Sequence, residues 1–256
     1  MLDLHLIPNP EWGFRPILFT LGDFQVPSYS FFIFLAIIAG CLIYWLEARK
    51  IKSNNENTFY LLISALIAGA IGSKIPIIIL YWNQIFSSPQ GLEILVSGRS
   101  ILGGLIGGTI GVLYMKSRLK IKERRGNIFA PAIALGMALG RLGCFFRGCC
   151  FGKPTNLPWA INFGDGILRH PTQIYESIFM LGMFFYLNWK KKKNPKPGQL
   201  FDILIIGYLT FRFFIEFIRA EEIVFLGLTF FQIICLLGLL WYSRFYLKGV
   251  FIRDKT

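Results

Sequence analysis

Seven apolar stretches recur along the 256 residues, and each approaches the length of a membrane-spanning helix. A helix needs about 20 apolar residues to cross the hydrocarbon core of a bilayer. The stretches lie at residues 28–46, 58–82, 97–115, 128–146, 172–189, 200–218 and 225–242. The composition agrees, since 54% of the residues are hydrophobic and only 16% are charged. The apolar stretches account for most of the chain and leave no room for a second domain. The sequence predicts an all-α integral membrane protein with seven transmembrane helices in a single domain, residues 1–256.

Two polar segments are predicted to stay outside the hydrocarbon core. Residues 1–27 carry Asp3, Glu11 and several prolines, and they lack the apolar run of a signal peptide. We expect this segment to form an interfacial arm. Residues 147–171 contain glycine, proline and charged residues and are too polar to cross a bilayer, so they are expected to form a small extracytoplasmic head.

The distribution of basic residues predicts the orientation. Most of the 27 lysines and arginines fall in residues 49–52, 116–125, 190–196 and 244–255, which are alternate connections between the expected spans. Basic loops stay in the cytoplasm, so the N-terminus is expected outside and the C-terminus inside. The net charge of +13 is then explained by topology and by contact with anionic membrane lipids, and nucleic-acid binding is not predicted.

Several cations remain within the spans or in their outward halves. They are Lys74, Arg99, Arg141, Arg147, Arg169, Arg212 and Arg219. Charge inside a bilayer is costly unless it is paired, and it commonly marks a site. Arg212, Glu216 and Arg219 have the spacing of one helix face, so Glu216 is expected to pair with an arginine. The cationic surplus favours binding of a lipid phosphate, which guanidinium groups grip bidentately; purely structural ion pairing is the alternative.

Two strings carry a resemblance to a known family: residues 140–152, GRLGCFFRGCCFG, and residues 169–176, RHPTQIYE. They resemble the signature region of the prolipoprotein diacylglyceryl transferases, and weaker matches extend the likeness over most of the chain. The resemblance implies a multi-pass enzyme of the bacterial cytoplasmic (inner) membrane, active in lipoprotein biosynthesis without a cofactor. Such an enzyme transfers the diacylglyceryl group of phosphatidylglycerol to a lipobox cysteine in a prolipoprotein signal peptide and releases glycerol phosphate.

The resemblance and the intramembrane cations together suggest a lipid- and phosphate-binding set. The predicted residues are Arg141, Arg147, Arg212, Glu216, Arg219, Tyr29, Lys74, Gly103 and Gly104. Arg141 and Arg219 are the phosphate binders that the resemblance implies, with Arg212 and Glu216 in support. Glycines at four-residue spacing in residues 103–111 also suit close helix packing, which is the alternative role for Gly103 and Gly104.

This chain departs from the family pattern at four polar positions. Leu102 stands where the family has a histidine in the third span, and Cys144, Arg147 and Cys149 stand in place of two asparagines and a glutamate. Three of the five cysteines, Cys144, Cys149 and Cys150, thus cluster at the outer end of the fourth span. The other two, Cys41 and Cys235, lie in spans and are interpreted as core residues.

Three interpretations of the cysteine cluster remain open. The first is a disulfide that joins Cys144 to Cys149 or Cys150 in an oxidising compartment. In the second, one thiol is an activated nucleophile, and the third is a metal site, which the irregular Cys-x4-Cys-Cys spacing disfavours. We predict no metal. His170 is the acid/base candidate, unless it merely contacts the start of the next helix.

Two functions are compatible with these features. The first is a phosphatidylglycerol-dependent transferase that moves a diacylglyceryl group to a thiol acceptor such as a prolipoprotein cysteine, with His170, Cys144, Cys149, Cys150 and Arg141 as the predicted catalytic residues. The second is a lipid-binding or thiol-redox membrane protein that is not a transferase and keeps the same scaffold.

Overall fold

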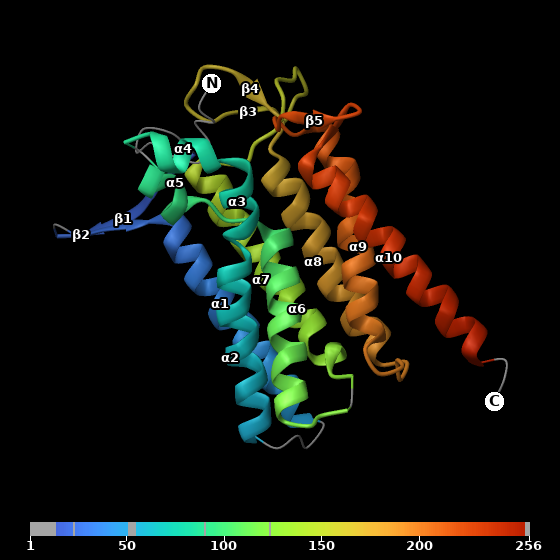
Figure 1. Ribbon diagram of the computed structural model, residues 1–256. Coiled ribbons are helices and arrows are strands. Elements are labelled where there is room, and N and C mark those ends of the chain that lie inside the picture. Colours follow the sequence, from blue (N-terminus) through green and yellow to red (C-terminus); the bar gives the residue numbers. More distant parts are fainter. Residues whose placement is uncertain (1–13, 23, 51–54, 90, 123, 254–256) are drawn as a thin grey trace.

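The structure is a computed structural model that describes residues 14–22, 24–50, 55–89, 91–122 and 124–253. The part of the 1–27 arm before residue 14 lies outside this range. Helices dominate, and their long axes run roughly side by side (Figure 1). The long helices are α1 (Ser28–Lys50), α2 (Asn55–Gly72), α6 (Ile101–Arg118), α7 (Gly126–Arg147), α8 (Thr172–Lys191), α9 (Gln199–Ile215) and α10 (Phe230–Arg253).

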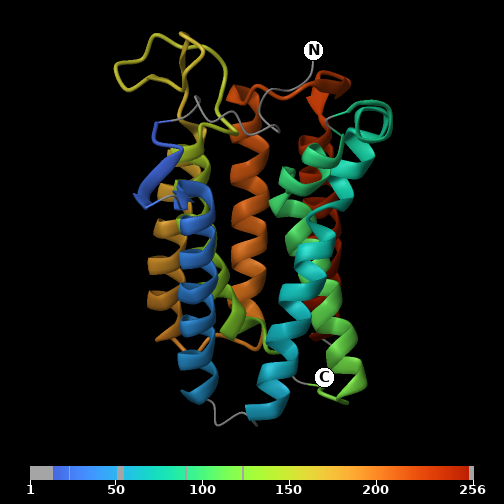
Figure 2. The ribbon, with the colours of Figure 1, turned by 90° about the vertical axis from the view of Figure 1, so that its left-hand side faces the viewer.

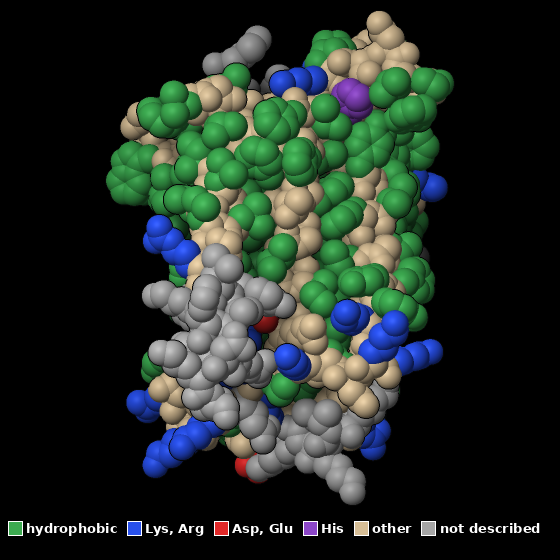
Figure 3. Space-filling view, turned by 90° about the vertical axis from the view of Figure 1, so that its right-hand side faces the viewer, with side chains coloured by type: hydrophobic (Ala, Val, Ile, Leu, Met, Phe, Trp, Pro, Cys, Tyr) green, Lys and Arg blue, Asp and Glu red, His purple; other side chains and the backbone are tan. Residues whose placement is uncertain are grey.

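Three helical segments in the described part of the chain are long and apolar enough to cross a membrane by themselves: Ser28–Arg49, Glu56–Leu80 and Gly126–Arg147. Large apolar side chains such as Phe34, Ile110 and Ile178 are more than half exposed. An apolar surface of this kind suits lipid rather than water. Figure 3 shows it on one face, where apolar side chains cover much of the upper and middle part and basic side chains gather toward the lower end.

The structure corrects the expected limits of several spans. The second is interrupted after Gly72, and a short helix, α3 (Ile75–Leu80), follows a turn at Ser73 and Lys74. Pro76 lies in the first turn of α3, where its missing N–H costs nothing. The third span begins at Ile101 rather than at residue 97, because the Ser100 side chain caps α6 by accepting from the Gly103 N–H at 3.2 Å.

Short helices and β-hairpins lie at the end of the molecule that carries the head. They are α4 (Trp82–Ser87), α5 (Gly91–Ser97), a 3-10 turn η1 (Glu216–Ile218), and three antiparallel hairpins: β1 (Ile17–Leu21) with β2 (Phe24–Pro27), β3 (Ile161–Asn162) with β4 (Leu168–Arg169), and β5 (Ile223–Phe225) with β6 (Leu228–Thr229). The expected sixth span therefore ends as α9 at Ile215, and the seventh begins only at Phe230, because residues 223–229 form a hairpin.

Helices α2 and α6 pack with almost no space between their backbones. A Cβ atom added to Gly72 would lie 2.6 Å from the Gly103 carbonyl oxygen and 2.7 Å from the Gly107 Cα atom. Only glycine permits this approach, as in other small-residue contacts between membrane helices. Figure 2 shows α1 on one side of the molecule and the α2–α6 pair on the other. The packing role suggested for the glycines of residues 103–111 is thus confirmed for Gly103 and Gly107.

The core lies where α7 meets its neighbours. Buried Ala130, Ala134 and Ala138 of α7 form one apolar cluster with residues of α8, α9 and α10, including Met180 and Leu204. Small alanines let α7 approach these helices closely. The C-terminal end of α7 and the start of α8 are consequently held side by side, and this arrangement positions the polar groups described next.

Candidate functional site

Three buried arginines and two buried glutamates form one ionic network near the head end of the bundle. Arg141 of α7 pairs with Glu176 of α8 at 2.8 Å, and Arg212 of α9 lies 3.6 Å from the same carboxylate. Arg212 also pairs with Glu216 at 2.9 Å, and Arg219 lies 3.5 Å from Glu216. The side chains of all five are at most 6% exposed. The pairing predicted from the spacing of Arg212, Glu216 and Arg219 is confirmed, although η1 interrupts the helix between them.

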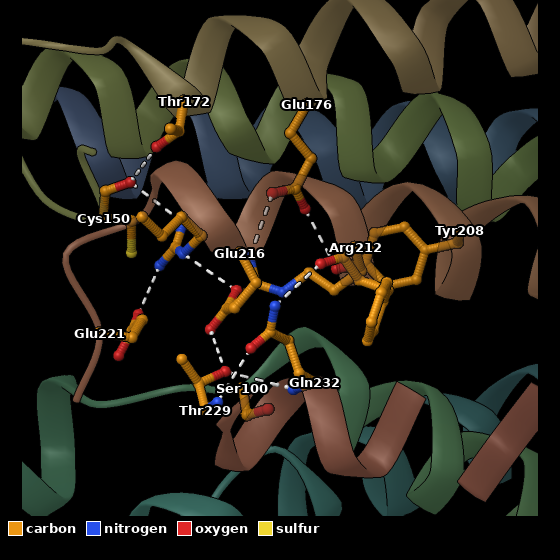
Figure 4. Close-up of polar contacts among 12 residues, drawn as sticks. Ser100, Cys150, Thr172, Glu176, Tyr208, Arg212, Glu216, Glu221, Thr229 and Gln232 are labelled. Carbon is orange, nitrogen blue, oxygen red and sulfur yellow. Dashed lines mark hydrogen bonds and ion pairs between the residues drawn. The ribbon is translucent and has the colours of Figure 1, made fainter. Parts of the chain in front are cut away.

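Neutral side chains complete the support of the two carboxylates. The Tyr208 hydroxyl donates to Glu176 Oε1 at 3.1 Å, and the Thr229 hydroxyl donates to Glu216 Oε1 at 3.1 Å. Gln232 accepts from the Thr229 N–H at 2.9 Å. In Figure 4 these side chains converge from α8, α9 and the start of α10. Because each carboxylate is held from several directions, the arginines that it contacts are fixed in position as well.

Within the fully buried part of the network, positive charges outnumber negative charges by one. Three buried guanidinium groups face two buried carboxylates, and Arg219 reaches a third, Glu221, which is partly exposed, at 2.8 Å. Arg141 Nε has no hydrogen-bond acceptor within the described part of the chain, whereas Arg212 Nη1 and Arg219 Nε reach carboxylate oxygens only at 3.6 and 3.5 Å. A buried donor without an acceptor costs about 1–3 kcal/mol. An anion bound here would give these donors closer acceptors.

A small cavity of about 90 Å³ lies against this network. Its walls include all three arginines together with Arg99, Ser100 and Leu102. The cavity has room for a compact polar group, and four guanidinium groups face or border it. Leu102 of α6 also forms part of the wall.

A second cavity, of about 770 Å³, occupies the other half of the bundle. Mostly apolar side chains from α1, α2, α6, α7 and α9 line it, among them Leu105, Phe129 and Ile133, and it has basic residues such as Lys116 at one end. Gly104 of the predicted lipid-binding set lies in its wall, whereas Leu102 lies in the wall of the small cavity. The two cavities therefore lie along neighbouring turns of α6.

The three clustered cysteines meet in space. All five cysteines are free, and the sulfur atoms of Cys144, Cys149 and Cys150 lie within 4.8 Å of one another. Arg141 Nη1 lies 3.9 Å from the Cys144 sulfur, and Cys150 borders the small cavity. Hydrogen bonds from Cys144 and Cys149, with the charge of Arg219, hold the pKa of the Cys150 thiol well below its usual range. A disulfide, the first interpretation of the cluster, is not formed in this structure.

Other predicted site residues lie away from the small cavity. The ring of Tyr29 contacts the guanidinium groups of Arg99 and Arg147, at 5.9 and 5.1 Å from its centroid. Lys74 donates to the carbonyl oxygens of Leu95 and Val96, each at 2.7 Å, and so ties α5 to the start of α3.

His170 lies at the base of the head, where the chain re-enters the bundle. Its Nδ1 atom is 3.4 Å from the Tyr175 hydroxyl, and its carbonyl oxygen accepts from the Gly152 N–H at 2.9 Å. Lys153 N donates to the Ile218 carbonyl oxygen at 2.8 Å, so the head also packs on the segment after α9. These contacts bring Arg219 to the Cys150 carbonyl oxygen at 3.1 Å.

The predicted site residues did not include Tyr208 or Ser100, although the structure places both at the network or the cavity. Glu176 carried a usable signal, because it is an acidic residue at the start of an apolar span. Tyr208 and Ser100 carried none, since such residues are common in membrane helices and helix caps.

The family model described as prolipoprotein diacylglyceryl transferase matches residues 16–247. The chain belongs to this family. It is 35% identical over 214 residues to the phosphatidylglycerol–prolipoprotein diacylglyceryl transferase of Clostridium tetani, covering 81% of this chain and 86% of that one. The second such transferase of Clostridium perfringens is 31% identical over 249 residues, which cover 92% and 97% of the two chains.

The Finegoldia magna transferase is a third such relative, 35% identical over 217 residues that cover 81% of this chain and 84% of that one. The predicted family resemblance is confirmed. Family membership and the long apolar helices imply a multi-pass protein of a bacterial membrane. The family match extends across α7, the head and α8, so the cysteine cluster lies within the matched part of the chain rather than in an added domain.

Proposed function

We propose that this protein transfers the diacylglyceryl group of phosphatidylglycerol to the thiol of a prolipoprotein cysteine. The observation that carries the proposal is the small cavity whose wall contains four arginines, Arg99, Arg141, Arg212 and Arg219, and one carboxylate, Glu221. The names of the relatives supply the two substrates. The network supplies a physical reason why an anionic lipid headgroup would bind here.

The proposed reaction forms one bond and breaks one. The acceptor thiolate attacks the glyceryl carbon that carries the phosphate ester, the carbon–oxygen bond breaks, and glycerol phosphate leaves with the electron pair. The thiol proton passes to a base at the outer end of the bundle, for which His170 is the proposed residue. Arg141 and Arg219 hold the phosphate, and their charge stabilises the negative charge that grows on the leaving group.

The two buried carboxylates hold the arginines in position before the phosphate binds. Glu176 and Glu216 hold Arg212 between them and each hold one further arginine, so the guanidinium groups need little reorganisation when the phosphate arrives. Tyr208 and Thr229 fix the carboxylates in turn. The site needs no metal for the phosphate, because the arginines provide the positive charge.

The large apolar cavity is proposed to take the acyl chains. It lies along α6 next to the small cavity, so a lipid with its phosphate at the arginines would extend its chains past Leu105 toward Phe129 and Ile133. Its volume of about 770 Å³ and its mostly apolar walls suit hydrocarbon. Lys116, at the far end, would lie near the opposite membrane surface.

We further propose that seven helical segments span the cytoplasmic membrane, with the N-terminus outside. The basic connections at residues 49–52, 116–125 and 190–196 then face the cytoplasm, and the head faces outward together with the arginine network. This orientation places the phosphate site in the leaflet from which an exported prolipoprotein is modified.

Complementation tests the proposal in cells. A bacterial strain whose own diacylglyceryl transferase is depleted should grow and process its lipoproteins when it expresses this chain, and not when it expresses Arg141→Gln. Arg118→Gln is the matched control. Arg118 is an exposed arginine at the C-terminal end of α6, whereas the small cavity lies at the start of that helix. Failure of the wild-type chain, at membrane levels equal to those of a working relative, would contradict the proposed activity.

A further inference from the structure

Cys144, Cys149 and Cys150 are irregularly spaced in the sequence, but their side chains form a compact group in the folded chain. The last turn of α7 supplies Cys144, and the chain then reverses at Gly148, whose φ of 75° ends the helix in the left-handed region. The reversal returns Cys149 and Cys150 to the helix end. The three sulfur atoms lie within 4.8 Å of one another, so the irregular sequence spacing does not argue against a metal site.

The backbone that presents these thiols is strained and firmly anchored. Cys150 has a φ of 62°, a conformation that non-glycine residues adopt at a cost. Side chains from elsewhere hold both cysteine carbonyl groups: Gln173 Nε2 donates to Cys149 O at 2.6 Å, and Thr172 Oγ1 donates to Cys150 O at 2.7 Å. Such anchoring would not be needed for thiols that merely fill space, and it fixes the sulfur atoms as a preformed group.

We propose that Cys144, Cys149 and Cys150 bind a soft, thiophilic monovalent cation, Cu(I), in a three-coordinate site at the outer end of α7. Thiolate ligands select Cu(I) and Zn(II) over harder ions. Zn(II) requires four ligands, and no further Cys, His, Asp or Glu of the described residues joins this group. Three sulfurs complete the coordination of Cu(I), whereas Zn(II) would need a water molecule as its fourth ligand.

The dimensions and the charge both fit. A cation about 2.3 Å from each of three coplanar sulfurs would set the sulfur–sulfur distances near 4.0 Å, which requires only small movements from the 4.8 Å limit observed. Each thiol that becomes a ligand releases its proton to solvent. Three thiolates and one monovalent cation carry a net charge of −2, and the guanidinium groups of Arg141 and Arg219 lie beside them.

An entry path and a supporting shell are also present. Cys150 borders the small cavity, so a cation can reach the sulfurs from that side, whereas Cys149 is buried and only 7% exposed. The Arg141 guanidinium lies 3.9 Å from the Cys144 sulfur and takes the place of the hydrogen-bond donors that commonly surround metal-bound thiolates.

The test is a metal titration of the full-length protein in nanodiscs, kept reduced and free of air. Cu(I) is delivered from a chromophoric chelator, and its transfer to the protein is followed by the loss of the chelator's absorbance. We expect one equivalent bound by the wild type, at least tenfold weaker binding by Cys149→Ser and by Cys150→Ser, and wild-type binding by Cys235→Ser, the control for a buried thiol outside the group. X-ray absorption should show three sulfur neighbours.

Several outcomes would overturn the proposal. They are equal binding by wild type and both cluster variants, a disulfide between any two of the three cysteines in protein isolated without air, or Zn(II) bound as tightly as Cu(I). Thermal unfolding without Cu(I) shows whether each variant is folded. With Cu(I), the midpoint of unfolding should rise for the wild type and Cys235→Ser only. Every readout concerns metal binding, so failure of this proposal can be told apart from failure of the transferase proposal.

Discussion

Replacing Arg141 with glutamine removes one guanidinium from the ionic network and leaves its neighbours in place. Breaking a buried ion pair costs about 3–5 kcal/mol when the remaining partner is left unpaired. Glu176 would still have Arg212 at 3.6 Å and the Tyr208 hydroxyl at 3.1 Å. We therefore expect a loss of unfolding free energy at the lower end of that range, about 3 kcal/mol.

The effect on turnover should be larger than the effect on lipid affinity. Arg141 is proposed to stabilise charge that develops on the leaving phosphate, and loss of one such donor costs a factor of about 10²–10³ in kcat. The assay measures the initial rate of thioether formation on a lipobox peptide at saturating phosphatidylglycerol, with the protein in nanodiscs. Arg118→Gln, an exposed arginine on α6, should keep the wild-type rate.

A double variant separates folding from chemistry. Arg141→Gln combined with Glu176→Gln removes the ion pair from both sides, so it should regain part of the lost stability but none of the lost activity. If Arg141→Gln turned over within tenfold of the wild type, or if the double variant recovered activity together with stability, Arg141 would have only a structural role.

Three further predictions follow from particular contacts. Gly72→Leu should clash with the backbone of α6 and lower the midpoint of thermal unfolding, whereas Gly182→Leu, a glycine with open space around its Cβ position, should not. His170→Gln should slow thioether formation about 10²-fold without changing lipid affinity, and an unchanged rate would remove its proposed role. Leu105→Trp should raise KM for long-chain phosphatidylglycerol more than for a short-chain analogue, because Leu105 lines the apolar cavity; equal effects would argue against chains lying there.

The helical part of the fold could be predicted because apolar composition dictates it, whereas its interruptions could not. The segment from Glu56 to Leu80 is apolar throughout, so hydropathy gives no warning that the chain turns at Ser73 and Lys74. Pro76 was the available signal. The hairpin at residues 223–229 was hidden for the same reason, since isoleucine, valine and phenylalanine suit a strand as well as a membrane helix.

The site could be predicted only where its contacts are local. The Arg212–Glu216 pair follows from helical spacing alone, and it is present at 2.9 Å. Arg141 and Glu176 come from different helices, so their pairing depends on how α7 packs on α8, which the order of residues does not reveal. The meeting of Cys144 with Cys149 and Cys150 likewise depends on the reversal at Gly148, whose importance appears only in the folded chain.

The proposed reaction can be tested most directly by following both products at once. Phosphatidylglycerol labelled in an acyl chain and in the glycerol headgroup is incubated with the purified protein and a lipobox peptide, with a Cys→Ser peptide as the control. Mass spectrometry should show a diacylglyceryl thioether on the cysteine peptide alone, formed in equal amount with released glycerol phosphate. A protein that binds the lipid but yields neither product, where a relative yields both, would show that this scaffold is not a diacylglyceryl transferase.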